Sequence, residues 1–83
     1  MEALLSPKAA KEFKALSRVV QNRFLVAFEK LESDPYNLSK QLRTKKLTDG
    51  RFSLRTDRYR AIFKIDDDQI MVTVIRHRKD AYR

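Results

Sequence analysis

Several residue types that build common functional sites are absent or scarce. The 83 residues contain no cysteine, and they include one histidine, one glycine and two prolines. Without cysteine the chain forms neither disulfides nor thiolate metal sites, which fits a reducing compartment. One histidine is too few for an imidazole-based zinc site, and no Walker or G-x-G-x-x-G loop is present for a nucleotide. We therefore expect no metal and no cofactor.

Long apolar runs are missing as well. The longest are only a few residues, so we expect no segment to span a bilayer. The opening M-E-A-L-L-S-P lacks the cationic start and the apolar stretch of a signal peptide. A chain of this length allows one domain with one modest core. We expect a single domain over residues 1–83, in the cytoplasm and with no membrane partner.

What the chain does have is positive charge. Nineteen Lys and Arg stand against eleven Asp and Glu, a net charge of +8. Residues 1–42 carry seven bases and five acids, whereas residues 43–83 carry twelve bases and six acids. The excess therefore lies in the second half, and it indicates a polyanionic partner. The alternative from charge alone is a basic face that is merely solvated.

Residues 51–65 alternate between apolar and cationic side chains, with Ile62 as the one apolar residue on the cationic side. Because neighbouring side chains of a strand point to opposite faces, the pattern predicts two strands with an apolar face and a basic face. Residues 70–75 are apolar at both sets of positions, Ile70, Val72 and Val74 against Met71, Thr73 and Ile75, which places this strand inside the sheet.

Short turns connect these strands. Thr56-Asp57 and Asp66-Asp67-Asp68 predict hairpins, so the three strands form an antiparallel meander. The three aspartates lack the further ligands of a calcium loop, and we interpret them as a solvated tip. Asp49-Gly50 is another turn. Leu38–Lys46 is polar and basic, and we interpret it as one further helical turn before the sheet half begins at Leu47.

The first half predicts a short strand and two helices. Ala3–Leu5 is an edge strand, and Ser6-Pro7 begins a helix whose polar side places Lys8, Lys11, Glu12 and Lys14 in water. Ser17 caps a second helix that ends at residues 33–37. The apolar stripes of the two helices are core positions: Ala9, Ala10, Phe13 and Leu16 in the first, and Val20, Phe24, Ala27, Phe28 and Leu31 in the second.

The predicted fold is α+β with the order β-α-α-β-β-β. A helical hairpin packs on one face of a small antiparallel sheet, and the N-terminal strand pairs at a sheet edge or beside the last strand. The other face, which carries the arginines, is left open.

The composition permits phosphate chemistry without a metal. RNA carries its own nucleophile, the 2′-hydroxyl, so a protein must position the backbone, neutralise charge and move protons. Guanidinium groups stay ionised and bind phosphate oxygens in a planar fork. His77 or Tyr82, near the end of the third strand, could transfer protons. Each has an ordinary alternative as a surface side chain, and Arg55 and Arg60 could be a solvated strand face.

The chain resembles the RelE/ParE superfamily of toxins from bacterial and archaeal toxin–antitoxin pairs, and the RelE side more closely. The resemblance covers nearly the whole chain. The matching segments are L-S-P-K-A-A-K-E-F-K-A-L, D-P-Y, K-K-L, F-S-L-R-T-D-R-Y-R-A-I-F-K-I and V-I-R-H-R-K-D-A-Y-R. The combination of Y-R-A-I-F with H-R-K-D-A-Y is its more specific part.

The resemblance implies a fold of microbial-ribonuclease type and a toxin that cuts mRNA in the ribosomal A site, leaving a 2′,3′-cyclic phosphate. It also implies a cognate antitoxin that wraps and blocks the toxin in a hetero-oligomer. By position, Arg60 matches the arginine in the family's Y-R segment, and Arg78 and Tyr82 match the arginine and tyrosine of its C-terminal tail. Arg76 could be the counterpart of that tail arginine instead of Arg78.

The sequence departs from RelE at two positions. Arg51 and Ser53 stand where RelE has lysines, and arginine is too basic to transfer protons. We expect His77 to take part of that role. The predicted catalytic residues are Arg51, Arg60, His77, Arg78 and Tyr82, and the predicted RNA-phosphate contacts are Lys45, Lys46, Arg55, Arg58, Arg76 and Lys79.

Two other functions fit part of the sequence. A ParE-like inhibitor of DNA gyrase is one alternative, although the H-R-K-D-A-Y ending argues against it. A basic RNA-binding module or a decayed toxin is the other. The chain lacks the aromatic platform of single-strand binders, because its aromatic residues lie on the apolar faces.

Overall fold

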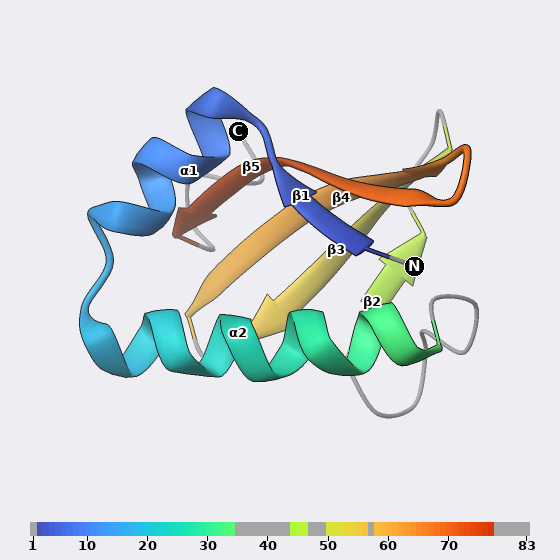
Figure 1. The fold of residues 1–83 in the computed structure, drawn as a ribbon. Coiled ribbons are helices and arrows are strands. Elements are labelled where there is room, and N and C mark those ends of the chain that lie inside the picture. Colours follow the sequence, from blue (N-terminus) through green and yellow to red (C-terminus); the bar gives the residue numbers. More distant parts are fainter. Residues whose placement is uncertain (1, 35–43, 47–49, 57, 78–83) are drawn as a thin grey trace.

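Two helices and five strands make up the part of the chain that the structure describes. The structure is a computed structural model, and it describes residues 2–34, 44–46, 50–56 and 58–77, with the backbone alone at 44–46. The elements follow in chain order (Figure 1): β1 (Glu2–Leu5), α1 (Pro7–Lys14), α2 (Arg18–Ser33), β2 (Thr44–Lys46), β3 (Arg51–Thr56), β4 (Tyr59–Asp66) and β5 (Gln69–His77).

The strands form one sheet in the order β1-β5-β4-β3-β2. The predicted α+β class and the antiparallel meander of the last three strands are confirmed. The N-terminal strand lies at the edge and beside the last strand, as expected, but it runs parallel to β5. The sheet is therefore mixed rather than wholly antiparallel. No described helix has the length and apolar character needed to cross a membrane.

β2 is a strand that the sequence did not predict. Thr44–Lys46 pairs antiparallel with residues 52–54 of β3, so the helical turn expected within Leu38–Lys46 is wrong at these three positions. Their polar side chains show no apolar alternation, and the segment becomes a strand because β3 offers it backbone partners. Residues 38–43 of that stretch lie outside the described part.

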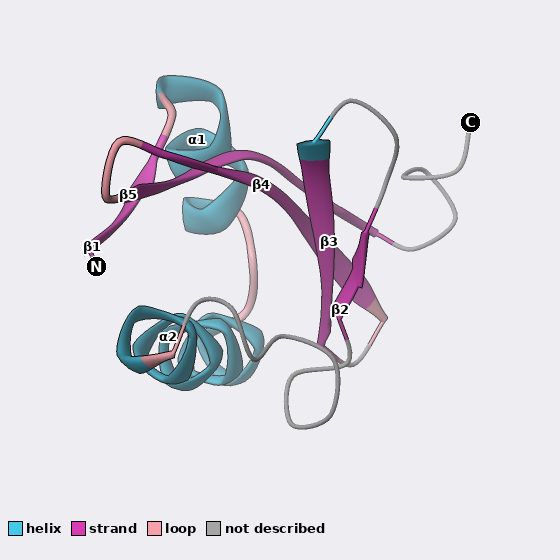
Figure 2. Cartoon of the chain, turned by 90° about the vertical axis from the view of Figure 1, so that its right-hand side faces the viewer, coloured by secondary structure: helices cyan, strands magenta, loops and turns pink. Residues whose placement is uncertain are grey.

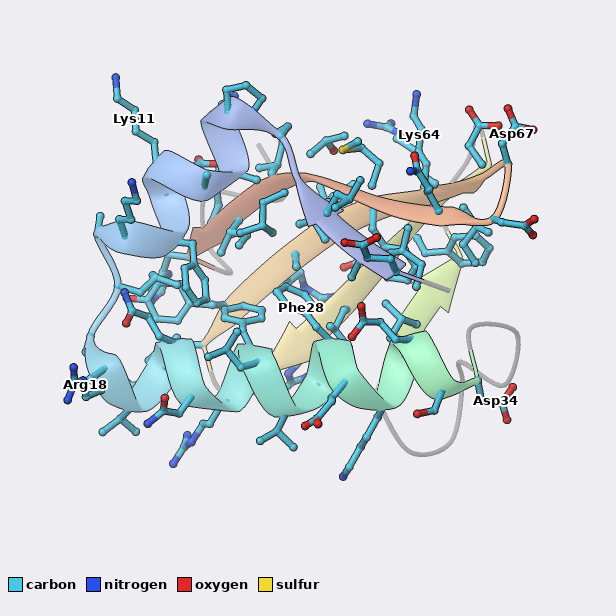
Figure 3. The ribbon with its side chains drawn as sticks, in the orientation of Figure 1. Lys11, Arg18, Phe28, Asp34, Lys64 and Asp67 are labelled. Carbon is cyan, nitrogen blue, oxygen red and sulfur yellow. The ribbon has the colours of Figure 1, made fainter. Side chains whose placement is uncertain are left out.

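The helices begin where their caps predict. Ser6 Oγ accepts a hydrogen bond from the Ala9 amide at 3.1 Å, and Ser17 Oγ accepts one from the Val20 amide at 3.3 Å. The predicted stripe of α2 is buried against the sheet. In Figure 3, Phe28 points from α2 toward the sheet, whereas Lys64 points away on the other side. Figure 2 shows the sheet curving around α2.

α1 lies along the edge of β5 that β1 leaves unpaired. β1 pairs with β5 only as far as Val72. Beyond it, the Ser6 hydroxyl donates to the Thr73 carbonyl at 3.1 Å, and a carboxylate oxygen of Glu12 accepts from the Ile75 amide at 3.0 Å. The helices thus supply partners that protect an open strand edge. Glu12, expected in water, is instead part of the fold.

A β-bulge interrupts the pairing of β4 with β5. Phe63 pairs with Val72 and Ile62 with Val74, so Thr73 is an extra residue. Ile75 is consequently 2% exposed on the helix side, while Val74 is half-buried on the open side. The predicted alternation, with Val74 on the side of Ile70 and Val72, is wrong beyond the bulge. Both sets of positions are apolar here, so the pattern gives no sign of the extra residue.

We predict unequal costs for two leucine truncations on α2. Leu31 is fully buried, and Leu31→Ala should lower the free energy of unfolding by about 2–5 kcal/mol, because it removes packed methyl groups and leaves a cavity. Leu25 is 53% exposed, and Leu25→Ala should change the free energy by less than about 0.5 kcal/mol. Urea denaturation of both variants is the measurement, and equal losses would contradict this orientation of α2.

Candidate functional site

Three arginines stand side by side on the open face of the sheet. Arg60 of β4 pairs in register with Arg55 of β3 on one side and with Arg76 of β5 on the other. Neighbouring strands are about 4.8 Å apart, so three positive charges share a short row across the sheet. We call Arg55, Arg60 and Arg76 the arginine row. Like charges placed so close favour an anionic ligand.

A second pair of cations lies further along the same face. Arg51 of β3 pairs in register with Lys64 of β4. Ser53 lies between Arg51 and Arg55, and it is 3% exposed. Its Oγ accepts a hydrogen bond from Nη1 of Arg60 at 2.9 Å. This bond draws the Arg60 guanidinium from the arginine row toward the centre of the face.

The arginine side chains lie along the sheet rather than extending into water. The Nε atoms of Arg51, Arg55 and Arg60 are enclosed by protein, although each residue is only half-buried overall. The aliphatic stems are therefore covered while other atoms of the side chains remain accessible. Among the described residues, the Nε–H of Arg55 meets no acceptor. Such packing restricts the rotamers, so less entropy is lost when an anion binds.

Arg76 is held by a carboxylate from α1. Its Nε lies 3.3 Å from Oε2 of Glu12, and the two side chains are 42% and 22% exposed. An ion pair this exposed contributes little to stability, so a phosphate can compete with it. Sequence reasoning missed this role of Glu12, because Glu12 is 64 residues away from Arg76 and its helical position is typical of solvated residues.

His77 lies apart from the arginine row. It pairs in register with Tyr59, and the two rings meet edge-on at a centroid distance of 5.4 Å and an angle of 77°. Tyr59 packs against the core, so the bulge has placed His77 on the helix side of β5. The structure therefore brings together Arg51, Arg55, Arg60 and Arg76 of the predicted site, but not His77.

The other predicted residues are at the margins or outside the described part. Arg58 is exposed at the hairpin tip between β3 and β4. Lys45 and Lys46 pair along the backbone with Ser53 and Phe52, and their side chains are not described. Arg78, Lys79 and Tyr82 lie beyond the last described residue, His77.

The open face is thus suited to holding phosphate groups. It can orient a polyanion and stabilise additional negative charge through guanidinium groups. No group of three or more potential metal ligands occurs among residues 2–34, 44–46, 50–56 and 58–77. The chemistry available from the described side chains is positioning and charge stabilisation.

Comparison with known proteins gives the family. The model described as "ParE toxin of type II toxin-antitoxin system, parDE" matches residues 3–82. The chain belongs to the RelE/ParE family of type II toxin–antitoxin toxins. The resemblance predicted from the sequence is confirmed.

A curated relative of this family member is Toxin RelG from Mycobacterium tuberculosis (strain ATCC 25618 / H37Rv). It is 39% identical over 59 residues, a segment that covers 69% of this chain and 66% of RelG. The match therefore spans slightly less than two thirds of the relative's length.

Solved structures share the fold of this toxin. The RelB–RelE antitoxin–toxin complex from Methanococcus jannaschii matches with a TM-score of 0.79 at 21% identity, covering 95% of this chain and 94% of that chain. The archaeal RelE–RelB complex from Pyrococcus horikoshii OT3 matches with a TM-score of 0.80 at 22% identity, covering 93% of each chain. At these identities the likeness establishes the fold.

We predict that Glu12 stabilises the toxin mainly through the Ile75 amide. Glu12→Ala removes the acceptor of that amide and should cost about 1–2 kcal/mol, with faster hydrogen exchange at Ile75. Glu12→Gln keeps an oxygen for the amide and loses only the exposed ion pair, so it should cost less than about 1 kcal/mol.

The matched control is Glu29→Gln on the exposed side of α2, which should leave stability unchanged. Denaturation and amide exchange of the three variants test the prediction. Unchanged exchange at Ile75 in Glu12→Ala would show that the carboxylate does not protect the strand edge.

Proposed function

We propose that this toxin is a ribosome-dependent endoribonuclease that cleaves mRNA in the A site. The observation that carries the proposal is the arginine row on the open face, with Arg60 drawn over the centre by Ser53. The family supports a toxin that acts in a type II toxin–antitoxin system. The resemblance to RelE supplies the class of reaction.

The proposed reaction needs no external nucleophile. The 2′-oxygen of one nucleotide forms a bond to the adjacent phosphorus as the bond from phosphorus to the 5′-oxygen breaks. The 2′-hydroxyl gives up its proton and the leaving 5′-oxygen gains one, so the products are a 2′,3′-cyclic phosphate and a 5′-hydroxyl. Negative charge builds up on the phosphate oxygens in the transition state, and nearby guanidinium groups stabilise it.

The described residues take the electrostatic roles. Arg60 contacts the scissile phosphate. Arg51 and Arg55, which both lie on β3, contact oxygens of the phosphate groups. Arginine stays protonated, so these residues stabilise charge and do not transfer protons. Tyr82 transfers protons, and Arg78 stabilises charge beside it. His77 does not take this role, because it lies beside Tyr59 on the helix side. Further contacts to the RNA backbone come from Lys45, Lys46, Arg58, Arg76 and Lys79.

The proposal includes an antitoxin as the partner in the cell. The two solved structures described above are RelB–RelE complexes, which supports a hetero-oligomer here as well. An acidic or amphipathic segment would complement the basic face of a chain with a net charge of +8. Such steering makes association fast and dependent on salt, and it would block the face on which RNA binds in the cytoplasm.

A ParE-like inhibitor of DNA gyrase is the second candidate, and the description of the matching family model favours it. The two activities separate cleanly. A supercoiling assay with purified gyrase reports inhibition, whereas primer extension on mRNA from programmed ribosomes reports cleavage. Gyrase inhibition with intact mRNA would replace the ribonuclease by this alternative.

We predict that Arg60→Ala lowers the rate of mRNA cleavage on programmed ribosomes by about 10²- to 10³-fold, the usual cost of removing one group that stabilises transition-state charge. Arg60→Lys should recover only part of the rate, because a single ammonium group does not reproduce the planar fork. Single-turnover cleavage followed by primer extension is the measurement.

The control for this prediction is Arg18→Ala. Arg18 is exposed at the start of α2 (Figure 3), so its loss removes one positive charge and should leave the rate unchanged. Thermal unfolding of each variant confirms that the fold is kept. Wild-type cleavage by Arg60→Ala would exclude the proposed role of Arg60.

A further inference from the structure

An apolar band crosses the open face between the cations. Ile62 of β4 pairs in register with Val74 of β5, and Met71 of β5 pairs with Leu4 of β1. All four side chains are half-buried, yet none belongs to the apolar residues that pack against the core. Ile62 and Val74 form the central part of this surface, and we call this pair the apolar seat.

The bulge brings the second half of the apolar seat to the open face. In an uninterrupted ladder Ile62 would pair with Thr73, and Val74 would point toward the helices with Val72. The extra residue moves Val74 opposite Ile62. Thr73 donates its hydroxyl to the Ile62 carbonyl at 3.2 Å, which fixes the distortion at this point. The bulge thus places the apolar Val74 opposite Ile62, where an uninterrupted ladder would have placed the hydroxyl-bearing Thr73, and the two β-branched side chains form a stiff apolar surface.

Cations flank the apolar seat in both directions along β4. Arg60 precedes Ile62 by two residues and Lys64 follows it by two, so the two cationic positions are about 13 Å apart along the strand. The Arg60 guanidinium lies closer to Ile62 than this spacing implies, because it donates a hydrogen bond to Ser53, which pairs in register with Ile62. An occupant of the seat must present an apolar surface with negative charge close beside it.

We propose that the apolar seat receives the flat face of one RNA base next to the scissile phosphate. This inference rests on the proposed function and adds a base subsite to it. A nucleotide carries a flat apolar base with negatively charged phosphates on both sides, which matches the apolar seat and the cations that flank it. Apolar side chains, as well as aromatic ones, pack against the face of a base, and every base has such a face, so this contact does not depend on sequence. The Ile62–Val74 surface therefore positions a nucleotide and leaves the base edges free.

The test is the binding of a labelled 2′-O-methyl RNA hexamer, which cannot be cleaved, followed by fluorescence anisotropy at low salt. Ile62→Thr keeps a β-branched residue in β4 but replaces apolar surface with a hydroxyl. It should weaken binding about 5- to 30-fold. Val19→Thr makes a similar change at an exposed site on α2 and should leave the affinity unchanged.

A set of hexamers, each with one abasic nucleotide, identifies the base. At one position the loss of the base should weaken wild-type binding and remove the difference between wild type and Ile62→Thr. The inference is overturned if wild type does not bind the hexamer or if Ile62→Thr binds as tightly as wild type. It is also overturned if the difference persists with every abasic hexamer, which would show a general structural effect.

Two further measurements distinguish the base subsite from a protein-docking surface and from the proposed nuclease activity. If Ile62→Thr binds RNA normally but loses affinity for the protein encoded beside the toxin gene, the band is a protein-docking surface and the base subsite is wrong. Cleavage on programmed ribosomes tests the proposed function by itself. Binding that depends on Ile62 and on one base, without any cleavage, would retain the subsite and exclude the nuclease.

Discussion

The extra residue in β5 decides which side chains share the open face. Before it, Ile70 and Val72 point toward the helices; after it, Ile75 does so, and Arg76 joins Arg60 on the opposite side. His77 moves to the helix side by the same step and meets Tyr59. A sheet of identical composition without the bulge would have Arg76 under the helices and a histidine on the open face. Bulges in other sheets likewise re-aim side chains beside functional sites.

One glutamate from each helix accepts a hydrogen bond from a backbone amide at an unpaired edge of the sheet. Glu12 accepts the Ile75 amide and pairs with Arg76, and Glu32 of α2 accepts the Ala3 amide of β1 at 2.8 Å. Each carboxylate satisfies a backbone donor that none of the described strands pairs with, and its charge discourages pairing with another sheet. The helices thus complete the sheet at its sides as well as covering its core, and through Glu12 the fold is connected directly to the arginine row.

Much of this arrangement follows from the sequence. Caps at Ser6 and Ser17, the α2 stripe and the alternation of residues 51–65 predict the helices, the core and the basic face, because each is a local pattern with a fixed period. Non-local features left no such pattern. β2 exists through pairing with β3, Glu12 acts across the fold, and the bulge is hidden among residues that are apolar in both registers. The Arg60–Ser53 bond likewise depends on the register of two strands.

The central claim is that Arg76 and Arg60 share one face because β5 carries a bulge at Thr73. Inter-strand nuclear Overhauser effects measure that register directly in solution. The structure predicts backbone contacts that pair Arg60 with Arg76, together with contacts between the rings of Tyr59 and His77. Contacts that pair Arg60 with Ile75 and Tyr59 with Arg76 would show an uninterrupted ladder. Arg76 would then lie on the helix side, and the arginine row would not exist.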